Sequence, residues 1–266
     1  MGTSTMADGA REKVATRDRS ATVVRPLQWR GLEQVAGIAH DMRAPLATIT
    51  TSAELLEQDL NADESAHLVN VIQRQAYRLQ QMIQDLAEFI RLPENGINIR
   101  AEEVDLTDLV REVAAGFQSF TTTHHLTIEL PDAAISALVD GEKVRRILQN
   151  LLGNAFQYSP RGTSVLARLC LSRSGANEVV IEVEDEGSGV PEADRENVFE
   201  PFVRLDAGSG NGQGLGLHIV RRFTEAHGGR AWVEDGERGG ARFCVALPLP
   251  ASSAAESESG PAAVVV

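Results

Sequence analysis

The stretch that decides the fold is residues 32–60, LEQVAGIAHDMRAPLATITTSAELLEQDL. Its apolar residues are separated alternately by three and four positions. This heptad spacing places them along one side of a helix and favours pairing with other helices. The sequence therefore predicts a long amphipathic helix. The residues of this first seam are Leu32, Val35, Ala39, Met42, Leu46, Ile49, Ala53, Leu56 and Leu60.

A turn and a second helix follow the first seam. Residues 61–65, NADES, are turn-forming and helix-capping types that interrupt the first helix. The second heptad pattern ends before Pro93 and Gly96, and consists of Leu68, Ile72, Gln75, Leu79, Met82, Leu86 and Phe89. Two helices joined by a short turn form an antiparallel hairpin, which alone cannot bury two full seams. We therefore expect two chains to pair as a homodimeric four-helix bundle.

The pattern changes over residues 97–250, where short β-rich runs alternate irregularly with helical stretches. We expect helices to cover one face of a mixed sheet, because there is no regular strand–helix–strand rhythm. The predicted fold class is α+β, a helical hairpin followed by an α/β sandwich. The expected strands are residues 97–101, 125–130, 136–139, 165–171, 179–183, 231–234 and 241–247, and the expected helices are residues 105–117, 141–157, 192–198 and 214–227.

Composition limits the possible functions. The 266 residues carry 25 Lys and Arg against 38 Asp and Glu, and a net charge of −13 argues against a general nucleic-acid binder. The chain lacks both a membrane-spanning apolar run and a secretory signal segment, so we expect a cytoplasmic protein without membrane insertion. Two isolated cysteines suggest neither a disulfide framework nor a zinc site. We expect disordered tails at residues 1–27 and 251–266, flanking domains at 28–94 and 97–250.

His40 is the first candidate for chemistry. Asp41 follows it directly, and a carboxylate beside an imidazole can accept the Nδ1 proton and raise the nucleophilicity of Nε2. Pro45 removes a helical hydrogen bond five residues further on, which favours a hinge there. The alternative is an ordinary solvated histidine on a helix.

Two polar motifs suit a bound ligand. Asn150 and Asn154 are four residues apart on one helix face, where two amides can hold hydrated Mg²⁺ and phosphate oxygens. Asp185 closes a Val- and Ile-rich strand and can accept a hydrogen bond from an exocyclic amine, while Gly187 and Gly189 let the backbone approach a ligand closely. Taken alone, these motifs also fit surface amides and a plain glycine turn.

A glycine-rich run occupies residues 208–217, GSGNGQGLGL, and leads into a predicted helix. The amides at the start of that helix favour phosphate. The run has neither the spacing of a dinucleotide-binding fingerprint nor the ending of a Walker loop. A flexible linker is the alternative.

In their order and spacing, these motifs resemble those of the sensor histidine kinases of two-component signalling. The resemblance covers about residues 28–250. The matching stretches are residues 40–46 (HDMRAPL, phosphoacceptor box), 150–159 (NLLGNAFQYS, N box), 185–189 (DEGSG, first glycine box), 198–202 (VFEPF, F box) and 212–216 (GQGLG, second glycine box).

The resemblance implies a dimerisation and histidine-phosphotransfer hairpin followed by an ATP-binding domain of the Bergerat type. His40 would take the γ-phosphoryl group of ATP with Asp41 as its orienting base, and Asn154 would ligate Mg²⁺. The implied partners are a second copy of the chain and the receiver domain of a separate response regulator. Only about 30 residues precede the hairpin, too few for a sensor domain, so we expect either a separate sensor protein or docking by the basic N-terminal tail to bring the input. The implied nucleotide-binding residues are Asn150 supporting Asn154, Asp185 with the backbone of Gly187 and Gly189, Tyr158 in the pocket wall, Phe199 and Phe202 as lid anchors, and Gly212, Gly214 and Gly216 in the lid.

Two residues depart from the family pattern. Gln157 stands where the N box usually carries a lysine, so a positive charge near the phosphates is missing, and Arg161 and Arg204 are candidates to replace it. Ala44 stands where relatives that dephosphorylate their regulator carry Thr or Asn, which predicts a kinase with weak phosphatase activity.

Two other functions remain open at this point. A dimeric phosphotransfer hub or pseudokinase with a weakly active ATP domain is compatible with Gln157. A chaperone- or topoisomerase-like ATPase shares the nucleotide fold but has no need of a hairpin carrying His40. Whether phosphorylation runs within or between subunits also stays open.

Overall fold

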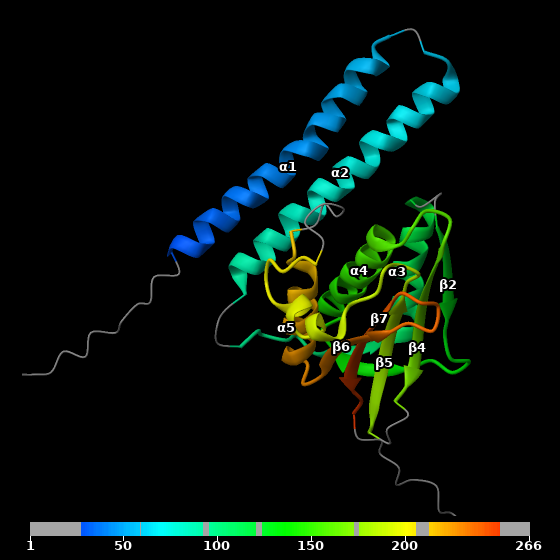
Figure 1. Cartoon of the computed structure of the whole chain (residues 1–266). Coiled ribbons are helices and arrows are strands. Elements are labelled where there is room, and N and C mark those ends of the chain that lie inside the picture. The colour runs from blue at the N-terminus through cyan, green and yellow to red at the C-terminus, as the bar shows by residue number, and fades with distance from the viewer. Residues whose placement is uncertain are drawn as a thin grey trace, which may run out of the picture.

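The computed structural model shows a helical hairpin resting on a layer of helices that covers a β-sheet (Figure 1). No helix among the described residues is both long and apolar enough to span a membrane. The structure describes residues 28–58, 60–92, 96–120, 124–172, 176–205 and 213–250.

The hairpin consists of α1 (Gln28–Leu56) and α2 (Ala62–Arg91). Asn61 caps α2, because its side chain accepts from the Glu64 N–H at 2.9 Å while the Glu64 carboxylate accepts from the Asn61 N–H at 3.1 Å. The second helix therefore begins inside the predicted turn, and Leu60 lies in the connection rather than in the first seam. α1 runs through Pro45 as one helix.

α1 has one side that the rest of the chain covers and one side that is exposed. Pro45 and Ser52 are buried and Ile49 is half-buried, so these residues form the side of α1 that the chain itself covers. Leu46 is 56% exposed, although it belongs to the same predicted seam. The side chains of Leu32, Val35 and Ala39 lie outside the described part of the chain. The outward side of the hairpin around Leu46 is thus available to a second pair of helices.

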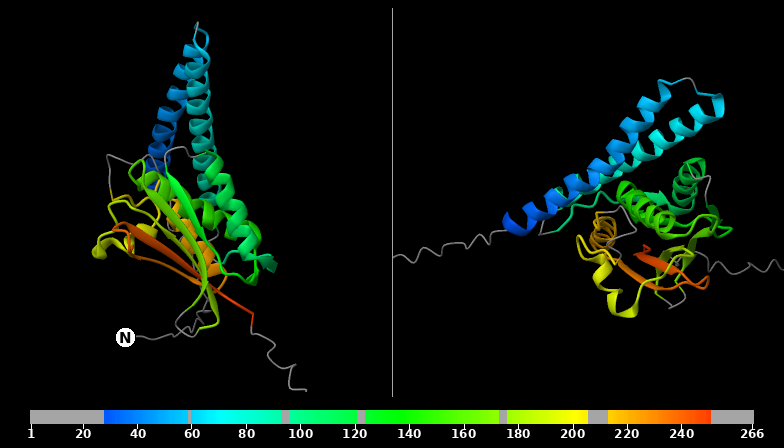
Figure 2. Two further views of the ribbon diagram at one scale, coloured as in Figure 1. Left: turned by 90° about the vertical axis from the view of Figure 1, so that its right-hand side faces the viewer. Right: turned by 45° about the horizontal axis from the view of Figure 1, so that its top comes forward.

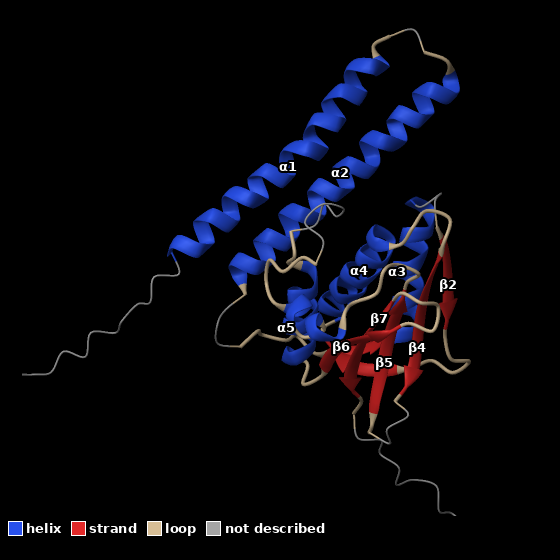
Figure 3. Cartoon of the chain, in the orientation of Figure 1, coloured by secondary structure: helices blue, strands red, loops and turns tan. Residues whose placement is uncertain are grey.

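The main sheet is mixed and has the strand order β2-β4-β5-β7-β6 (Figure 3). β2 runs parallel to β4, and the other neighbouring pairs are antiparallel. A separate two-stranded sheet pairs β1 with β3. The strands are β1 (Glu102–Asp105), β2 (His125–Glu129), β3 (Ser136–Val139), β4 (Ser164–Leu171), β5 (Glu178–Glu184), β6 (Arg230–Asp235) and β7 (Ala241–Pro248).

Three helices, α3 (Leu106–Phe120), α4 (Gly141–Tyr158) and α5 (Gly216–Ala226), lie on one face of this sheet (Figure 2). α4 lies in the core, where Ile147, Leu148 and Leu151 are at most 1% exposed. Burial of such side chains supplies about 1.5–3 kcal/mol each. The predicted α/β sandwich with helices on one face is confirmed.

Two predicted elements are wrong in detail. Residues 97–101 form no strand, because the Arg100 N–H donates to the Asp140 carboxylate at 3.1 Å instead of to a strand neighbour. The first strand is β1, the next segment along. The helix predicted over residues 192–198 is two short 3-10 turns, η1 (Glu192–Asp194) and η2 (Asn197–Phe199).

A buried arginine joins the hairpin to the sandwich. Arg146 of α4 is 5% exposed and donates to four side chains of α2. Its Nη2 lies 2.6 Å from Asp85 Oδ1 and its Nε lies 3.1 Å from Glu88 Oε2, while Gln81 and Gln84 accept from Nη1. Removing one partner from a buried charge pair costs about 3–5 kcal/mol, so this cluster fixes where α2 sits. We refer to it as the Arg146 cluster.

We expect α2 to dock more firmly on α4 as the pH falls from about 7 to 5. Two carboxylates face one guanidinium in the Arg146 cluster, and burial raises the pKa of Asp85 to about 6 despite the opposing effect of Arg146. A pKa that is higher in the docked state means that docking takes up a proton, so its stabilisation is complete below about pH 4 and is lost as the pH rises through 6. Hydrogen exchange of the α2 amides across this range measures the effect.

The variant Asp85→Asn should make the protection factors of the α2 amides, which are corrected for the intrinsic pH dependence of exchange, independent of pH between 5 and 7, because the amide imitates the protonated carboxyl. Asp132→Asn, an exposed carboxylate remote from α2, is the matched control and should behave as the wild type. Flat protection in the wild type over the same range contradicts the prediction.

Leu46→Asp should convert a dimer into a monomer. The substitution places a charge on the outward side of α1, where desolvating it in a helix bundle costs several kcal/mol. Sedimentation of the protein at micromolar concentration measures its oligomeric state. Leu138→Asp, which changes a leucine 59% exposed on β3, is the control and should stay dimeric. A dimeric Leu46→Asp protein contradicts the assignment of this side of α1 to the interface.

Candidate active site

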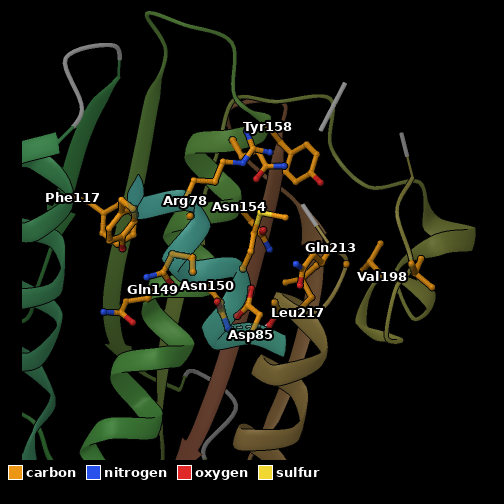
Figure 4. Close-up of a pocket in the computed structure, with 18 residues that line it drawn as sticks. Arg78, Asp85, Phe117, Gln149, Asn150, Asn154, Tyr158, Val198, Gln213 and Leu217 are labelled. Atoms are coloured by element: carbon orange, nitrogen blue, oxygen red, sulfur yellow. Dashed lines mark hydrogen bonds between the residues drawn. The ribbon is translucent and has the colours of Figure 1, made fainter. Parts of the chain in front are cut away.

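Two cavities meet beside the C-terminal half of α4. The first, which we term the sheet-end cavity, is lined by Asp185 and Gly189 after β5, by Phe243 of β7 and by Arg204. The second, the α2 cavity, is lined by α2, α4 and residues 213–217 (Figure 4). Both cavities share Asn154, Tyr158, Val198, Val203 and Leu217. The shared wall makes them two parts of one elongated site.

Asp185 lies at the closed end of this site. It follows β5, is 4% exposed, and its Oδ1 accepts from the Gly187 N–H at 2.7 Å and from the Ala241 N–H at 3.3 Å. Burial raises the pKa of Asp185, and the backbone donors oppose that shift. These donors hold the carboxyl group in place with Oδ2 left to accept from a ligand.

Glycines let the backbone close around Asp185. A Cβ on Gly187 would lie 2.8 Å from the Tyr158 carbonyl oxygen, and one on Gly240 would lie 2.2 Å from the Asp185 carbonyl oxygen. Gly189 has a φ of +70°, a backbone conformation that favours glycine. Gly240 was missed in the sequence, although the Gly239-Gly240 doublet before a strand was a usable signal.

The two asparagines of α4 have different surroundings. Asn150 is 8% exposed and its Nδ2 donates to the Gly216 carbonyl at 3.2 Å, which ties α4 to the first residue of α5. Asn154, one turn later, lines both cavities. Its amide oxygen is a ligand type that Mg²⁺ accepts, and no group of three acidic, His or Cys side chains among the described residues forms a separate metal site. The donor set fits an ion that takes its other ligands from phosphates and water.

The segment between η2 and α5, which we term the lid, is held at its base by aromatic residues. Phe199 is 1% exposed and lies edge-on to Phe243 at 6.4 Å. The Phe202 N–H donates to the Gly214 carbonyl at 2.8 Å, and both residues have positive φ values, 66° and 69°. A Cβ on Gly214 would lie 2.7 Å from the Val203 carbonyl oxygen. Gly216 begins α5, whereas Gly212 lies outside the described residues.

α1 reaches the base of the lid through Asp41. Asp41 Oδ2 lies 3.7 Å from Arg204 Nη1. His40 belongs to α1, but its side chain lies outside the description. The residue that directly follows the predicted phosphoacceptor therefore contacts the sandwich of the same chain.

The two cations considered as replacements for a charge at Gln157 lie apart. Gln157 lines the α2 cavity with a neutral side chain, and Arg161 is exposed in the turn after α4 and lines neither cavity. Arg204 lines the sheet-end cavity.

The sequence did not reveal three residues of α2 that line the α2 cavity, because polar residues outside a heptad seam resemble a solvated helix face. These residues are Tyr77, Arg78 and Gln81.

Two family models match the chain. The model "His Kinase A (phospho-acceptor) domain" matches residues 32–95, and the model "Histidine kinase-, DNA gyrase B-, and HSP90-like ATPase" matches residues 139–251. The first covers the hairpin, and the second covers the α4 to β7 part of the sandwich, which lines the sheet-end cavity and one side of the α2 cavity.

Curated relatives show the same pairing of domains. The chain is 34% identical over 227 residues to the sensor histidine kinase TmoS of Ectopseudomonas mendocina, covering 83% of this chain and 23% of TmoS. It is 33% identical over 222 residues to the adaptive-response sensory kinase SasA of a Synechococcus strain, covering 81% of this chain and 58% of SasA. The chain therefore spans less than two thirds of either relative.

Solved structures agree on the fold. Full-length ShkA in complex with AMPPNP superposes with a TM-score of 0.56 at 28% identity, covering 83% of this chain and 46% of ShkA. The Acinetobacter baumannii histidine kinase AdeS superposes with a TM-score of 0.53 at 19% identity, covering 80% of this chain and 98% of that one, a likeness in fold alone. With a phospho-acceptor hairpin and a histidine-kinase-like ATPase domain in this order, the chain belongs to the sensor histidine kinases of two-component signalling.

Proposed function

We propose that the chain is an ATP-dependent protein-histidine kinase that phosphorylates His40 and passes the phosphoryl group to an aspartate of a separate response regulator. The continuity of the two cavities carries this proposal. One end holds the buried carboxyl of Asp185, and the other is walled by α2 of the hairpin. We infer that one ATP molecule occupies both cavities, with its base near Asp185 and its phosphates towards the hairpin.

Different residues of the site contact different parts of the nucleotide. Asp185 accepts a hydrogen bond from the exocyclic amine of adenine, and Tyr158 lines the wall that both cavities share. Asn154 provides an amide ligand for Mg²⁺, which supplies charge neutralisation to the phosphates when it is bound. Gly214 and Gly216 allow the lid and the start of α5 to approach the phosphates closely, as the helix N-terminus favours an anion. Support for these roles comes from the positions of the residues around the cavities.

The reaction transfers the γ-phosphoryl group from oxygen to nitrogen. The lone pair of His40 Nε2 forms the N–P bond, the bond from the γ-phosphorus to the bridging oxygen breaks, and ADP leaves with that electron pair. The Asp41 carboxylate then accepts the Nδ1 proton of the cationic ring. An aspartate of the regulator attacks the same phosphorus in the next step, which breaks the N–P bond and restores neutral His40 once the proton returns.

We also infer the partners of the chain. The exposed outward side of α1 around Leu46 supports a homodimer. The receiver domain of a response regulator is the acceptor. The rival function is a phosphotransfer hub whose ATP domain is inactive, which the neutral side chain of Gln157 in the α2 cavity favours.

Incubation with γ-labelled ATP and Mg²⁺ should label the wild-type protein, while His40→Gln should remain unlabelled. ATP affinity should be nearly unchanged in His40→Gln, because the substitution lies outside the sandwich. His67→Gln, which changes an exposed histidine of α2, is the matched control and should label normally.

Asp185→Asn should lower both ATP affinity and labelling, because the Gly187 and Ala241 N–H groups hold the amide oxygen and leave an NH2 donor facing the exocyclic amine of adenine. A wild-type protein that binds ATP and takes up no label identifies the inactive hub. Label in His40→Gln contradicts the phosphoacceptor assignment.

The wild type should release little phosphate from a phosphorylated receiver domain, and Ala44→Thr should raise that release about tenfold or more. Ala44 lies one helical turn after His40 and has no side-chain donor or acceptor for a water molecule, whereas a positioned hydroxyl aids in-line attack. The measurement is the rate at which the phosphorylated receiver domain releases phosphate in a mixture that contains no ADP. Ala47→Thr, at another exposed alanine of α1, is the control. Equal release from both variants shows that a hydroxyl at position 44 is not the missing group.

A further inference from the structure

The α2 cavity contains one cationic side chain among the described residues that line it, and this cation comes from the hairpin. Arg78 of α2 lines the cavity opposite α4, together with Asn154 and Tyr158. Figure 4 shows Arg78 reaching towards Tyr158 above Asn154. Gln157, on the α4 side, contributes a neutral amide. A polyphosphate in this cavity would therefore meet its positive charge on α2.

The surroundings of Arg78 suit an added anion. Arg78 is half-buried, and this burial lowers the pKa of its guanidinium, as does the nearby cation of Arg204. Asp41 opposes both effects and also lies 3.7 Å from Arg204. The Asp41 carboxylate therefore acts on both guanidinium groups, one from the hairpin and one from the lid. A bound polyphosphate would add negative charge beside these two guanidinium groups, which repel each other.

Gln213 gives a second, independent indication of a ligand. Its side chain is 8% exposed and lines the α2 cavity, where neither its Oε1 nor its Nε2 has a hydrogen-bond partner. Burying an amide without partners costs about 1–3 kcal/mol. The amide Nε2 of Gln213 can donate to a phosphate oxygen, which satisfies this group when the cavity is filled.

We propose that Arg78 binds the terminal phosphates of ATP held in the sandwich of the same chain, with Gln213 donating to the same phosphates. This inference rests on the proposed function. If Arg78 has this role, the nucleotide site is complete only when α2 is docked on the sandwich, because the hairpin supplies the guanidinium group. Charge-assisted hydrogen bonds from a guanidinium are stronger than neutral ones. They recognise the negative charge of the outer phosphates and not the adenine base.

The test compares the affinities of the full-length chain for ATP, ADP and AMP in the presence of Mg²⁺. Arg78→Gln should lower ATP affinity about tenfold or more, lower ADP affinity less and leave AMP affinity unchanged. Arg78→Lys should keep part of the preference for ATP, and Gln213→Ala should lower ATP affinity without affecting AMP. Arg74→Gln, which removes an exposed arginine one turn earlier on α2, is the matched control and should bind as the wild type.

The salt dependence of binding provides a second readout. ATP affinity of the wild type should fall more steeply with ionic strength than that of Arg78→Gln, because one ionic contact is missing in the variant. An unchanged ratio of ATP to ADP affinity in Arg78→Gln overturns the inference. A parallel loss for ATP, ADP and AMP also overturns it, since Arg78 then only holds α2 in place. A wild-type chain that fails to bind ATP overturns the proposed function itself.

Discussion

The burial of Arg146 is the constraint on which the arrangement of the two halves depends. A guanidinium 5% exposed inside the protein must have its charge and its N–H groups satisfied, and four side chains of α2 satisfy them. The same register of α2 brings Phe89 edge-on to Phe202 at 5.0 Å and to His218 at 5.9 Å. The Arg146 cluster fixes the position of α2, and the aromatic contacts continue the interface between α2 and the sandwich to the base of the lid. Without Arg146, the carboxyl groups of Asp85 and Glu88 would lose the cation that pairs with both of them.

The docked hairpin changes what the sandwich can offer a ligand. The sandwich alone supplies the buried acceptor Asp185, the amide of Asn154 and the start of α5. The wall formed by α2 encloses the far part of the cavity and brings Arg78 there. Because enclosed charges interact more strongly than solvated ones, a cation on this wall has more effect than one on the open rim. Under the proposed role of Arg78, the phosphate end of the nucleotide site therefore depends on the position of the hairpin.

Local pattern was enough to predict most of the fold. The helices of the sandwich and the strands β2 to β7 follow from periodicity and turn residues, since each buries one continuous apolar face. Residues 97–101 have the same β-rich pattern, but the Asp140 carboxylate takes the Arg100 N–H, and such a contact between distant residues leaves no local trace. For the site, the motifs located Asp185, Asn154 and the lid glycines around the cavities. Gln81 and Arg146 escaped because they bond to each other across the two halves of the chain, and Arg78 escaped because α4 forms the opposite wall of its cavity.

Linkage between docking and nucleotide binding follows from these contacts. If Arg78 contacts the phosphates only when α2 is docked, ATP stabilises docking by the same free energy with which docking strengthens ATP binding. Loss of the terminal phosphate would then weaken the hold of the sandwich on α2 and release Asp41 from the neighbourhood of Arg204. A chain that docks with ATP and loosens with ADP would free Asp41, the neighbour of His40, from Arg204 after phosphorylation, when a receiver domain must reach α1. The same arginine would thus connect the chemical state of the nucleotide to the accessibility of the phosphorylated helix.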